Sequence, residues 1–306
     1  MDGGIDDALA LIVGLAAPEI EVVGITAVSG NVPVEQATKN ALRIVELLNR
    51  PQVWVAQGLA KPMVRDPIRA FSFHGKDGLG DSNLPDPKLR PLEKPAMQAF
   101  TETLSNYEKR AISIICTGPL TNMASLLTGF PDAIEKVEEV VIMGGAFGLT
   151  KYGIGNETPV AEFNIYSDPE AAKLVFESGV RIKAVGLDVT TIPRLELNMR
   201  DYGLIGKGRR RGAAFASRIL ENNMRAHGRF TLHDPMVVAV KIRPNFYRFE
   251  EHRVNIETKG EYTTGMTVAD RRNRSTDDRL AGKPAEVCSA VDLRFKRFFI
   301  KRLIDA

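Results

Sequence analysis

The sequence has few cysteines and little net charge, and both shortages argue against whole classes of protein. Cys116 and Cys288 are the two cysteines among 306 residues. They are too few for a disulfide framework and lack the spacing of a metal site, which favours a reducing compartment such as the cytoplasm. The formal net charge is +3, and we interpret the basic run at residues 207–211 as a solvated loop. We therefore expect no nucleic-acid partner.

Long apolar runs are also missing. No run of about 18 apolar residues and no signal peptide is present, so we expect a soluble protein with no membrane partner. The hydrophobic content of 44 % and the charged content of 26 % are ordinary for a globular protein. The length is sufficient to bury a large core, and we expect one domain spanning residues 1–306.

Segments typical of strands alternate with segments typical of helices. Strand patterns occur at residues 21–28, 53–56, 111–116, 137–143 and 182–187. Helical patterns occur at residues 6–16, from Pro33 onward, and at 95–107, 119–127, 168–178, 217–226 and 291–303. Two extended segments within residues 247–268 precede the last of these helices. This alternation predicts an α/β fold, a single large domain with a mostly parallel, doubly wound (Rossmann-like) central sheet flanked by helices.

The first residues and one long loop stand out from this pattern. In an open α/β sheet, functional groups lie at the carboxyl ends of strands, so a turn such as Asp2-Gly3-Gly4 before a helix is expected to follow a strand. Residues 1–5 leave no room for that strand, so we expect either that the chain is truncated at its N-terminus or that its true start lies upstream of Met1. Residues 58–91, rich in glycine, proline and aspartate, are interpreted as a functional loop.

The amino end carries an unusual concentration of carboxylates. Asp2, Asp6 and Asp7 lie within the first seven residues, and the Gly3-Gly4 turn allows Asp2 and Asp7 to converge on one hard cation. Calcium binds about six to eight oxygen ligands and prefers several carboxylates among them. Helix capping and the helix dipole are the alternative explanation, which accounts for one aspartate well and for three poorly.

Two further motifs carry groups that suit a polar site. His233 and Asp234 stand at a loop-to-helix junction before Pro235, either as a catalytic or as a structural pair. Thr117 follows a predicted strand, where its backbone carbonyl can remain free to bind an ion.

A third polar segment has no helical periodicity. It presents Asn156, Glu162 and Asn164, whose amides and carboxylate suit a polyhydroxylated ligand such as a sugar. An ordinary surface loop is the alternative.

Together these motifs resemble one family, the calcium-dependent nucleoside hydrolases of the inosine-uridine-preferring type. Residues 2–8 match the family's opening signature Asp-x-Asp-Pro-Gly-x-Asp-Asp-Ala from its second aspartate onward, with Gly3 in place of the proline. The family's first strand and first signature aspartate are missing. The matching motifs then follow in family order over nearly the whole chain, at residues 29–31, 74–80, 117–122, 143–145, 156–164, 233–235 and 265–270.

The resemblance implies an activity and a metal site. The activity is hydrolysis of the N-glycosidic bond of ribonucleosides to free base and ribose. Asp2, Asp7 and Asp234 would bind Ca²⁺ through their carboxylates, and Thr117 through its backbone carbonyl. Asp2 would also act as the base on a calcium-bound water, and His233 would protonate the leaving base.

The resemblance also implies a substrate-binding set and an assembly. The residues that would hold the nucleoside are Asp6, Asn31, Met143, Asn156, Glu162 and Asn164. His74 either helps to close the site or is a satisfied loop histidine. Relatives are commonly dimers or tetramers, so we expect a homo-oligomer.

Base preference and activity itself have open alternatives. The segment before His233 lacks the tyrosines that many relatives place over the base, and His227, Arg225 or Phe230 are candidate substitutes. A catalytically impaired relative that binds metal and nucleoside is the second reading, motivated by the missing strand. A magnesium-dependent phosphate-handling enzyme is the third, and it has no use for the His233-Asp234 pair.

Overall fold

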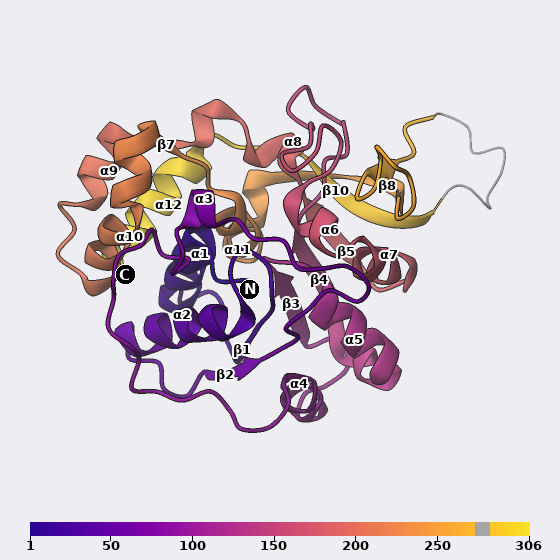
Figure 1. The fold of residues 1–306 in the computed structure, drawn as a ribbon, viewed down its shortest axis with the longest axis horizontal. Coiled ribbons are helices and arrows are strands. Elements are labelled where there is room, and N and C mark those ends of the chain that lie inside the picture. Colours follow the sequence, from indigo (N-terminus) through magenta and orange to yellow (C-terminus); the bar gives the residue numbers. More distant parts are fainter. Residues whose placement is uncertain (273–281) are drawn as a thin grey trace.

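A six-stranded mixed sheet forms the centre of the computed structural model, which describes residues 1–272 and 282–306 (Figure 1). Its strand order is β3-β4-β5-β10-β8-β9. The first four strands pair in parallel, while β8 and β9 are antiparallel to their neighbours. The bounds of these strands are Ile112–Cys116 (β3), Val137–Met143 (β4), Ile182–Val185 (β5), Lys283–Val291 (β10), Tyr247–Ile256 (β8) and Thr267–Ala269 (β9).

Two short pairs lie outside this sheet. β1 (Gly24–Ala27) and β2 (Trp54–Gln57) pair in parallel, and β6 (Leu197–Asn198) and β7 (Arg229–Phe230) pair antiparallel. The helical elements are α1 (Ile5–Ala16), α2 (Val34–Leu47), α3 (Phe71–His74), α4 (Ala96–Ser105), α5 (Thr121–Gly129), η1 (Pro131–Lys136), α6 (Phe163–Ser167), α7 (Pro169–Glu177), α8 (Leu187–Thr190), η2 (Pro193–Leu195), α9 (Met199–Ile205), α10 (Arg211–His227), α11 (His233–Ile242), η3 (Pro244–Phe246) and α12 (Arg294–Asp305).

Alternation along β4 explains why helices cover both faces of the sheet. Val141 and Met143 belong to the cluster that contains the buried faces of α1, α10, α11 and α12. Val140 and Ile142 belong to a second cluster, with α5 and α7. Successive strand residues point to opposite faces, so an apolar residue at every position requires cover on both sides. The predicted doubly wound α/β domain is confirmed, in mixed rather than mostly parallel form.

Several predicted boundaries shift, and one central strand escaped prediction. β10 lies between β5 and β8, and no strand was predicted there. Its last residue is also the first residue of the segment 291–303, which was predicted to be helical. Its sequence mixes charged and small residues, and its register with β8 shifts between Cys288 and Ala290. β5 ends at Val185 because Leu187 already begins α8. α10 begins at Arg211, so the last residue of the basic run is helical, and the run is largely exposed.

A cavity of about 450 Å³ separates β1 from β3 and divides the sheet that was predicted to be continuous. Its lining includes Thr26 from β1 and Ile114 and Cys116 from β3, and Cys116 is half-buried. The Met1 amino group donates to the Thr26 carbonyl (3.1 Å), and the Val28 N–H donates to the Met1 carbonyl (2.9 Å). Met1 is therefore bound alongside β1 and borders the cavity.

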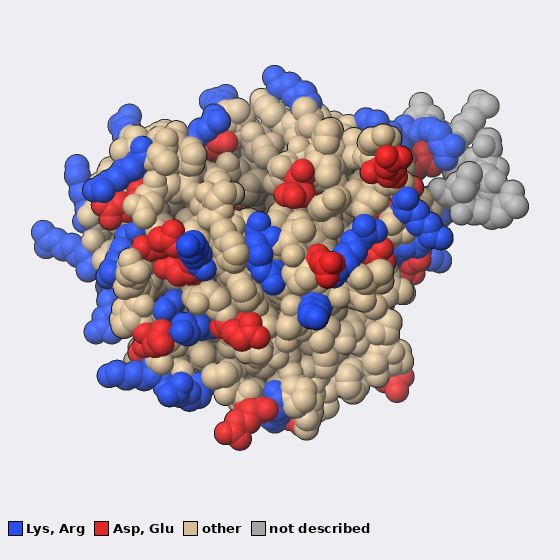
Figure 2. Space-filling view, in the orientation of Figure 1, with Lys and Arg blue, Asp and Glu red and all other residues tan. Residues whose placement is uncertain are grey.

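The surface carries both signs of charge. Figure 2 shows lysine and arginine side chains interspersed with aspartate and glutamate over most of the face in view. Within residues 1–272 and 282–306, no helix combines the length and the apolar character needed to cross a membrane.

We expect Leu9→Ala to lower the free energy of unfolding by about 2–5 kcal/mol, because it removes buried methyl groups and leaves a cavity. Leu9 is fully buried in α1, which packs against α11. Leu174→Ala in α7 is the matched control, since its side chain is 37 % exposed. Urea unfolding followed by circular dichroism measures both. Equal losses in the two variants would show that α1 does not form part of the cooperative core.

Candidate active site

The amino end of α1 folds back on itself through the carboxylate of Asp7. Asp7 Oδ2 accepts the Gly4 N–H at 2.8 Å, and Oδ1 accepts the Asp2 N–H at 3.2 Å. The Thr117 hydroxyl donates to the same Oδ1 at 2.7 Å. These donors hold Asp7 as a helix-capping residue and tie the loop after β3 to the start of α1.

Asp2 is clamped between two loops. Asn31 donates its backbone N–H to Asp2 Oδ2 at 2.8 Å and its side-chain amide to Oδ1 at 3.0 Å. Gly30 and Gly118 pack directly against the carboxylate: a Cβ at Gly30 would lie 2.1 Å from Asp2 Oδ2, and one at Gly118 would lie 2.8 Å from Asp2 Cβ. Only glycine allows this close approach, so Asp2 has little freedom to move.

Asp6, Asp7 and Asp234 form a buried group that can hold a metal ion. One carboxylate oxygen from each lies within 4.8 Å of the others. Asp6 Oδ1 is buried and has no hydrogen-bond partner among the described residues. Burial, followed by the charge of Asp7, raises the pKa of Asp6 to about 7. Clustered carboxylate oxygens suit a hard cation, so this donor set fits a metal ion.

The predicted metal ligands lie close together, with one difference in membership. The trio contains Asp6, which was predicted to hold the ribose, whereas Asp2 stands beside it. Burial, followed by the charge of Asp7, raises the pKa of Asp2 well above its ordinary value. Burial and then the charges of the three other aspartates raise the pKa of Asp234 likewise. The charges of neighbouring aspartates therefore contribute to the raised pKa values of Asp2, Asp6 and Asp234.

A second polar group lies around the start of α6. The Glu162 carboxylate caps this helix and accepts N–H groups from Asn164 (2.9 Å), Ile165 (3.0 Å) and Gly145 (3.1 Å). Burial raises its pKa to about 6 against the effect of these donors. The Asn164 side-chain amide donates to the Met143 carbonyl at the end of β4 (3.2 Å). The structure thus brings three predicted substrate-binding residues together.

Asn156 stands apart from this buried group. It is exposed, and its side-chain carbonyl accepts the N–H of Phe163 at 2.9 Å. Its amide orders the segment in front of α6, and its contact with a ligand stays a prediction.

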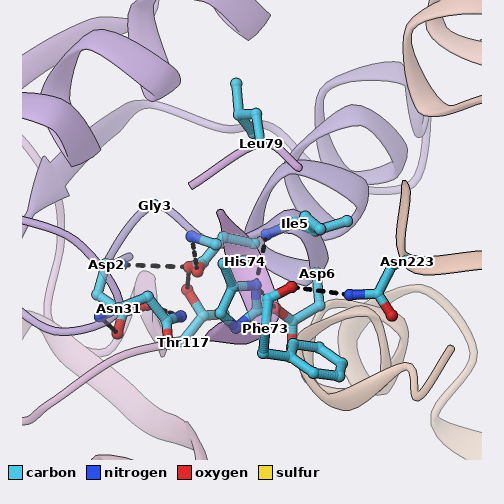
Figure 3. A network of polar contacts seen from close by, with 12 residues as sticks. Asp2, Gly3, Ile5, Asp6, Asn31, Phe73, His74, Leu79, Thr117 and Asn223 are labelled. Atoms are coloured by element: carbon cyan, nitrogen blue, oxygen red, sulfur yellow. Dashed lines mark hydrogen bonds and ion pairs between the residues drawn. The ribbon is translucent and has the colours of Figure 1, made fainter. Parts of the chain in front are cut away.

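His74 comes from the long loop 58–91 and covers the start of α1. Its Nδ1 accepts the Ile5 N–H at 3.1 Å and lies 3.9 Å from Asp6 Oδ1. Burial lowers the pKa of His74 to about 4, so the ring is neutral at pH 7. Figure 3 shows Asp2, Asn31 and Thr117 on one side of this ring and Asp6 on the other. The loop histidine is satisfied by a hydrogen bond and also stands at the site.

His233 begins α11, directly before Asp234. Its Nδ1 lies 2.9 Å from the hydroxyl of Thr190, at the end of α8. Burial and then the nearby His74 lower its pKa to about 4. Sequence reasoning overlooked Thr190, because 43 residues separate it from His233 and no local pattern joins them.

The helix before His233 differs from expectation. Arg225 and His227 are exposed, so neither joins the site in this structure, and Phe230 is buried against Phe73 with ring centroids 5.6 Å apart. Asn223 is the buried polar residue that prediction missed. It donates its side-chain amide to the Phe73 carbonyl at 2.8 Å, while its own Oδ1 is buried without a partner among the described residues.

Comparison with known proteins gives one consistent result. The family model for inosine-uridine preferring nucleoside hydrolases matches residues 1–299. The pyrimidine-specific ribonucleoside hydrolase RihA of Salmonella agona is 40 % identical over 277 residues, covering 88 % of this chain and 86 % of the relative. RihA of Escherichia coli O1:K1 / APEC is 39 % identical over 277 residues, with the same coverage.

Solved structures agree with this assignment. The plant nucleoside hydrolase PpNRh1 superposes with a TM-score of 0.90 at 28 % identity, covering 100 % of this chain and 98 % of that chain. The purine-preferring ribonucleoside hydrolase from Gardnerella vaginalis superposes with a TM-score of 0.87 at 30 % identity, covering 100 % and 96 %. The chain belongs to the inosine-uridine preferring nucleoside hydrolase family and is a hydrolase that acts on N-glycosyl bonds.

Proposed function

We propose that this protein hydrolyses ribonucleosides to free base and ribose, with a calcium ion bound at the aspartate cluster. The observation that carries the proposal is the buried group of Asp6, Asp7 and Asp234, in which Asp6 Oδ1 has no partner among the described residues. A buried, unpaired carboxylate oxygen is costly unless a ligand or cation completes it.

The residues around the cluster supply hard oxygen ligands. Asp7 and Asp234 would bind the ion, joined by Asp2 and by the backbone carbonyl of Thr117. Calcium accepts such a mixed set of carboxylate and carbonyl oxygens. When bound, it would supply a positive charge that orients water and the ribose hydroxyls.

Asp2 is the group that we assign as the base. The attacking water forms the new bond to C1′ and gives its proton to Asp2, while the bond from C1′ to the base nitrogen breaks. The two hydrogen bonds from Asn31 and the packing of Gly30 hold the carboxylate in one orientation. Such positioning is what a general base requires.

The ribose would be held by groups on both sides of the cluster. Asp6 offers its free Oδ1 to a hydroxyl, and Asn31 stands beside Asp2. We assign the remaining contacts to Asn156, Glu162 and Asn164, with Met143 beside them and His74 covering the amino end of α1. His233 is the group that we assign to the departing base, to which its ring N–H would donate a hydrogen bond as the base takes up a proton.

Assembly and location are proposals of the same kind. Cys116 and Cys288 are both free, which suits the reducing cytoplasm. A dimer or tetramer is expected from the family resemblance, and light scattering coupled to size-exclusion chromatography would measure it.

Purified protein is expected to release ribose from at least one of inosine, uridine, cytidine and adenosine, and EGTA is expected to abolish the release. Restoration by Ca²⁺ but not by Mg²⁺ would support calcium, because Mg²⁺ demands a smaller octahedral site. Release that resists EGTA would refute the metal assignment. Binding of Ca²⁺ without release from any nucleoside would instead indicate the catalytically impaired relative, and the order of the four rates would establish base preference.

Asp2→Asn is expected to lower kcat for ribose release by about 10²–10⁴-fold, because an amide cannot accept the proton of water. Asp86→Asn is the matched control, since that carboxylate is exposed and pairs with Lys39 at the surface. Steady-state kinetics under saturating Ca²⁺ measure both variants. A loss below tenfold for Asp2→Asn would contradict its role as the base.

Gly30→Ala is expected to lower kcat by about 10²-fold, the usual effect of misplacing a catalytic group by about 1 Å. Its Cβ would lie 2.1 Å from Asp2 Oδ2, whereas a Cβ at Gly129 meets nothing within 4 Å. Gly129→Ala is therefore the control, and circular dichroism confirms folding of both variants. A wild-type kcat in folded Gly30→Ala would show that catalysis does not depend on the packing of Gly30 against the Asp2 carboxylate.

A further inference from the structure

The Thr190 hydroxyl is the one hydrogen-bond partner of the His233 ring among the described residues. Thr190 Oγ1 lies 2.9 Å from His233 Nδ1, and the Thr190 side chain is fully buried. No described residue makes a hydrogen bond to the other ring nitrogen, Nε2. The ring is only partly covered, since His233 is less buried than its neighbours Leu232 and Asp234. One nitrogen is therefore held by protein, and the other is available to a ligand.

Burial decides which of the two groups donates. The Thr190 hydroxyl has no acceptor other than His233 Nδ1 among the described residues. If Nδ1 carried the hydrogen, the O–H of Thr190 would be a buried donor without an acceptor, which is costly. If Thr190 donates instead, its O–H is satisfied and Nδ1 is the acceptor nitrogen of a neutral imidazole. The second arrangement is favoured, and it places the ring hydrogen on Nε2.

The short helix that carries Thr190 is firmly anchored. The buried carboxylate of Asp188, two residues earlier, accepts backbone N–H groups from Phe147 (2.8 Å), Leu149 (2.6 Å) and Thr150 (3.2 Å). The Thr150 hydroxyl donates to the Asp188 carbonyl at 2.7 Å. These bonds join α8 to the loop after β4, so the Thr190 hydroxyl has a fixed position from which to hold the ring.

We propose that Thr190 is a positioning residue for His233, and that it selects the imidazole tautomer with hydrogen on Nε2. This inference rests on the proposed function, in which His233 serves the departing base. As the bond from C1′ to the base breaks, its electron pair moves onto the base. The Nε2–H of the neutral ring donates a hydrogen bond to that charge and keeps its hydrogen, and the base takes up its proton from solvent. Without the Thr190 hydroxyl, both tautomers and other ring orientations become accessible, and fewer molecules present a hydrogen there.

The kinetic test compares two leaving groups. Thr190→Val removes the hydroxyl at nearly constant shape, and we expect kcat for the best nucleoside to fall about tenfold with little change in KM, a fraction of the 10²–10⁴ typical of proton transfer. Hydrolysis of 4-nitrophenyl β-D-ribofuranoside is expected to change less than twofold, because 4-nitrophenolate leaves without a proton. Thr190→Ser, which keeps the hydroxyl, is expected to restore most of the nucleoside rate.

Thr191→Val is the matched control. It is the same substitution at the next residue, whose hydroxyl donates to the Leu187 and Tyr152 carbonyls and does not touch His233. It is expected to lower neither rate by more than twofold. In a His233→Ala background, Thr190→Val should have no further effect, since residues that act through one another are not additive. Equal losses on both substrates, or additive losses in the double variant, would overturn the proposal.

The tautomer itself can be observed without any activity. The chain contains only four histidines, so protein labelled with ¹⁵N at histidine gives few ring signals, and His233→Ala identifies those of His233. We expect hydrogen on Nε2 and a bare Nδ1 in the wild type, and a mixture in Thr190→Val. Hydrogen on Nδ1 in the wild type would refute the inference. Failure of the proposed function would appear separately, as a wild-type protein that releases no ribose.

Discussion

The burial of several carboxylates around the amino end of one helix is the constraint on which the rest of the site depends. Asp2, Asp6, Asp7 and Asp234 are each at most 5 % exposed. Like charges shielded from water repel strongly, and a fold tolerates them only when donors surround them. Backbone N–H groups, the Thr117 hydroxyl, the Asn31 amide and the dipole of α1 supply part of this compensation. A hard cation would supply the rest.

The sheet explains how distant segments meet at this point. Thr117 follows β3, Met143 ends β4 and α8 follows β5, while Asn31 follows β1 of the separate two-stranded pair. The carboxyl ends of parallel strands share one edge, where an open α/β sheet places its ligands. The cavity between β1 and β3 is bordered by Met1, Thr117 and Gly118.

The relatives named for different bases share this framework. One is called pyrimidine-specific and another purine-preferring, yet each aligns with at least 88 % of this chain. Ribose is common to all such substrates, whereas the base is not. In this chain the helix before His233 presents Arg225 and His227 to solvent, and Asn223 is buried.

Local sequence patterns determined most of the strand and helix order, the aspartates around the start of α1 and the placement of His233 beside Asp234, because each depends on periodicity or on residues a few positions apart. Only the tertiary structure decided that Asp6 joins Asp7 and Asp234, that His74 caps α1 from 69 residues away, and that Thr190 holds His233. It also placed β10 in the middle of the sheet. Such contacts join segments far apart in the chain, and a single sequence carries no periodic signal of which distant side chains will meet.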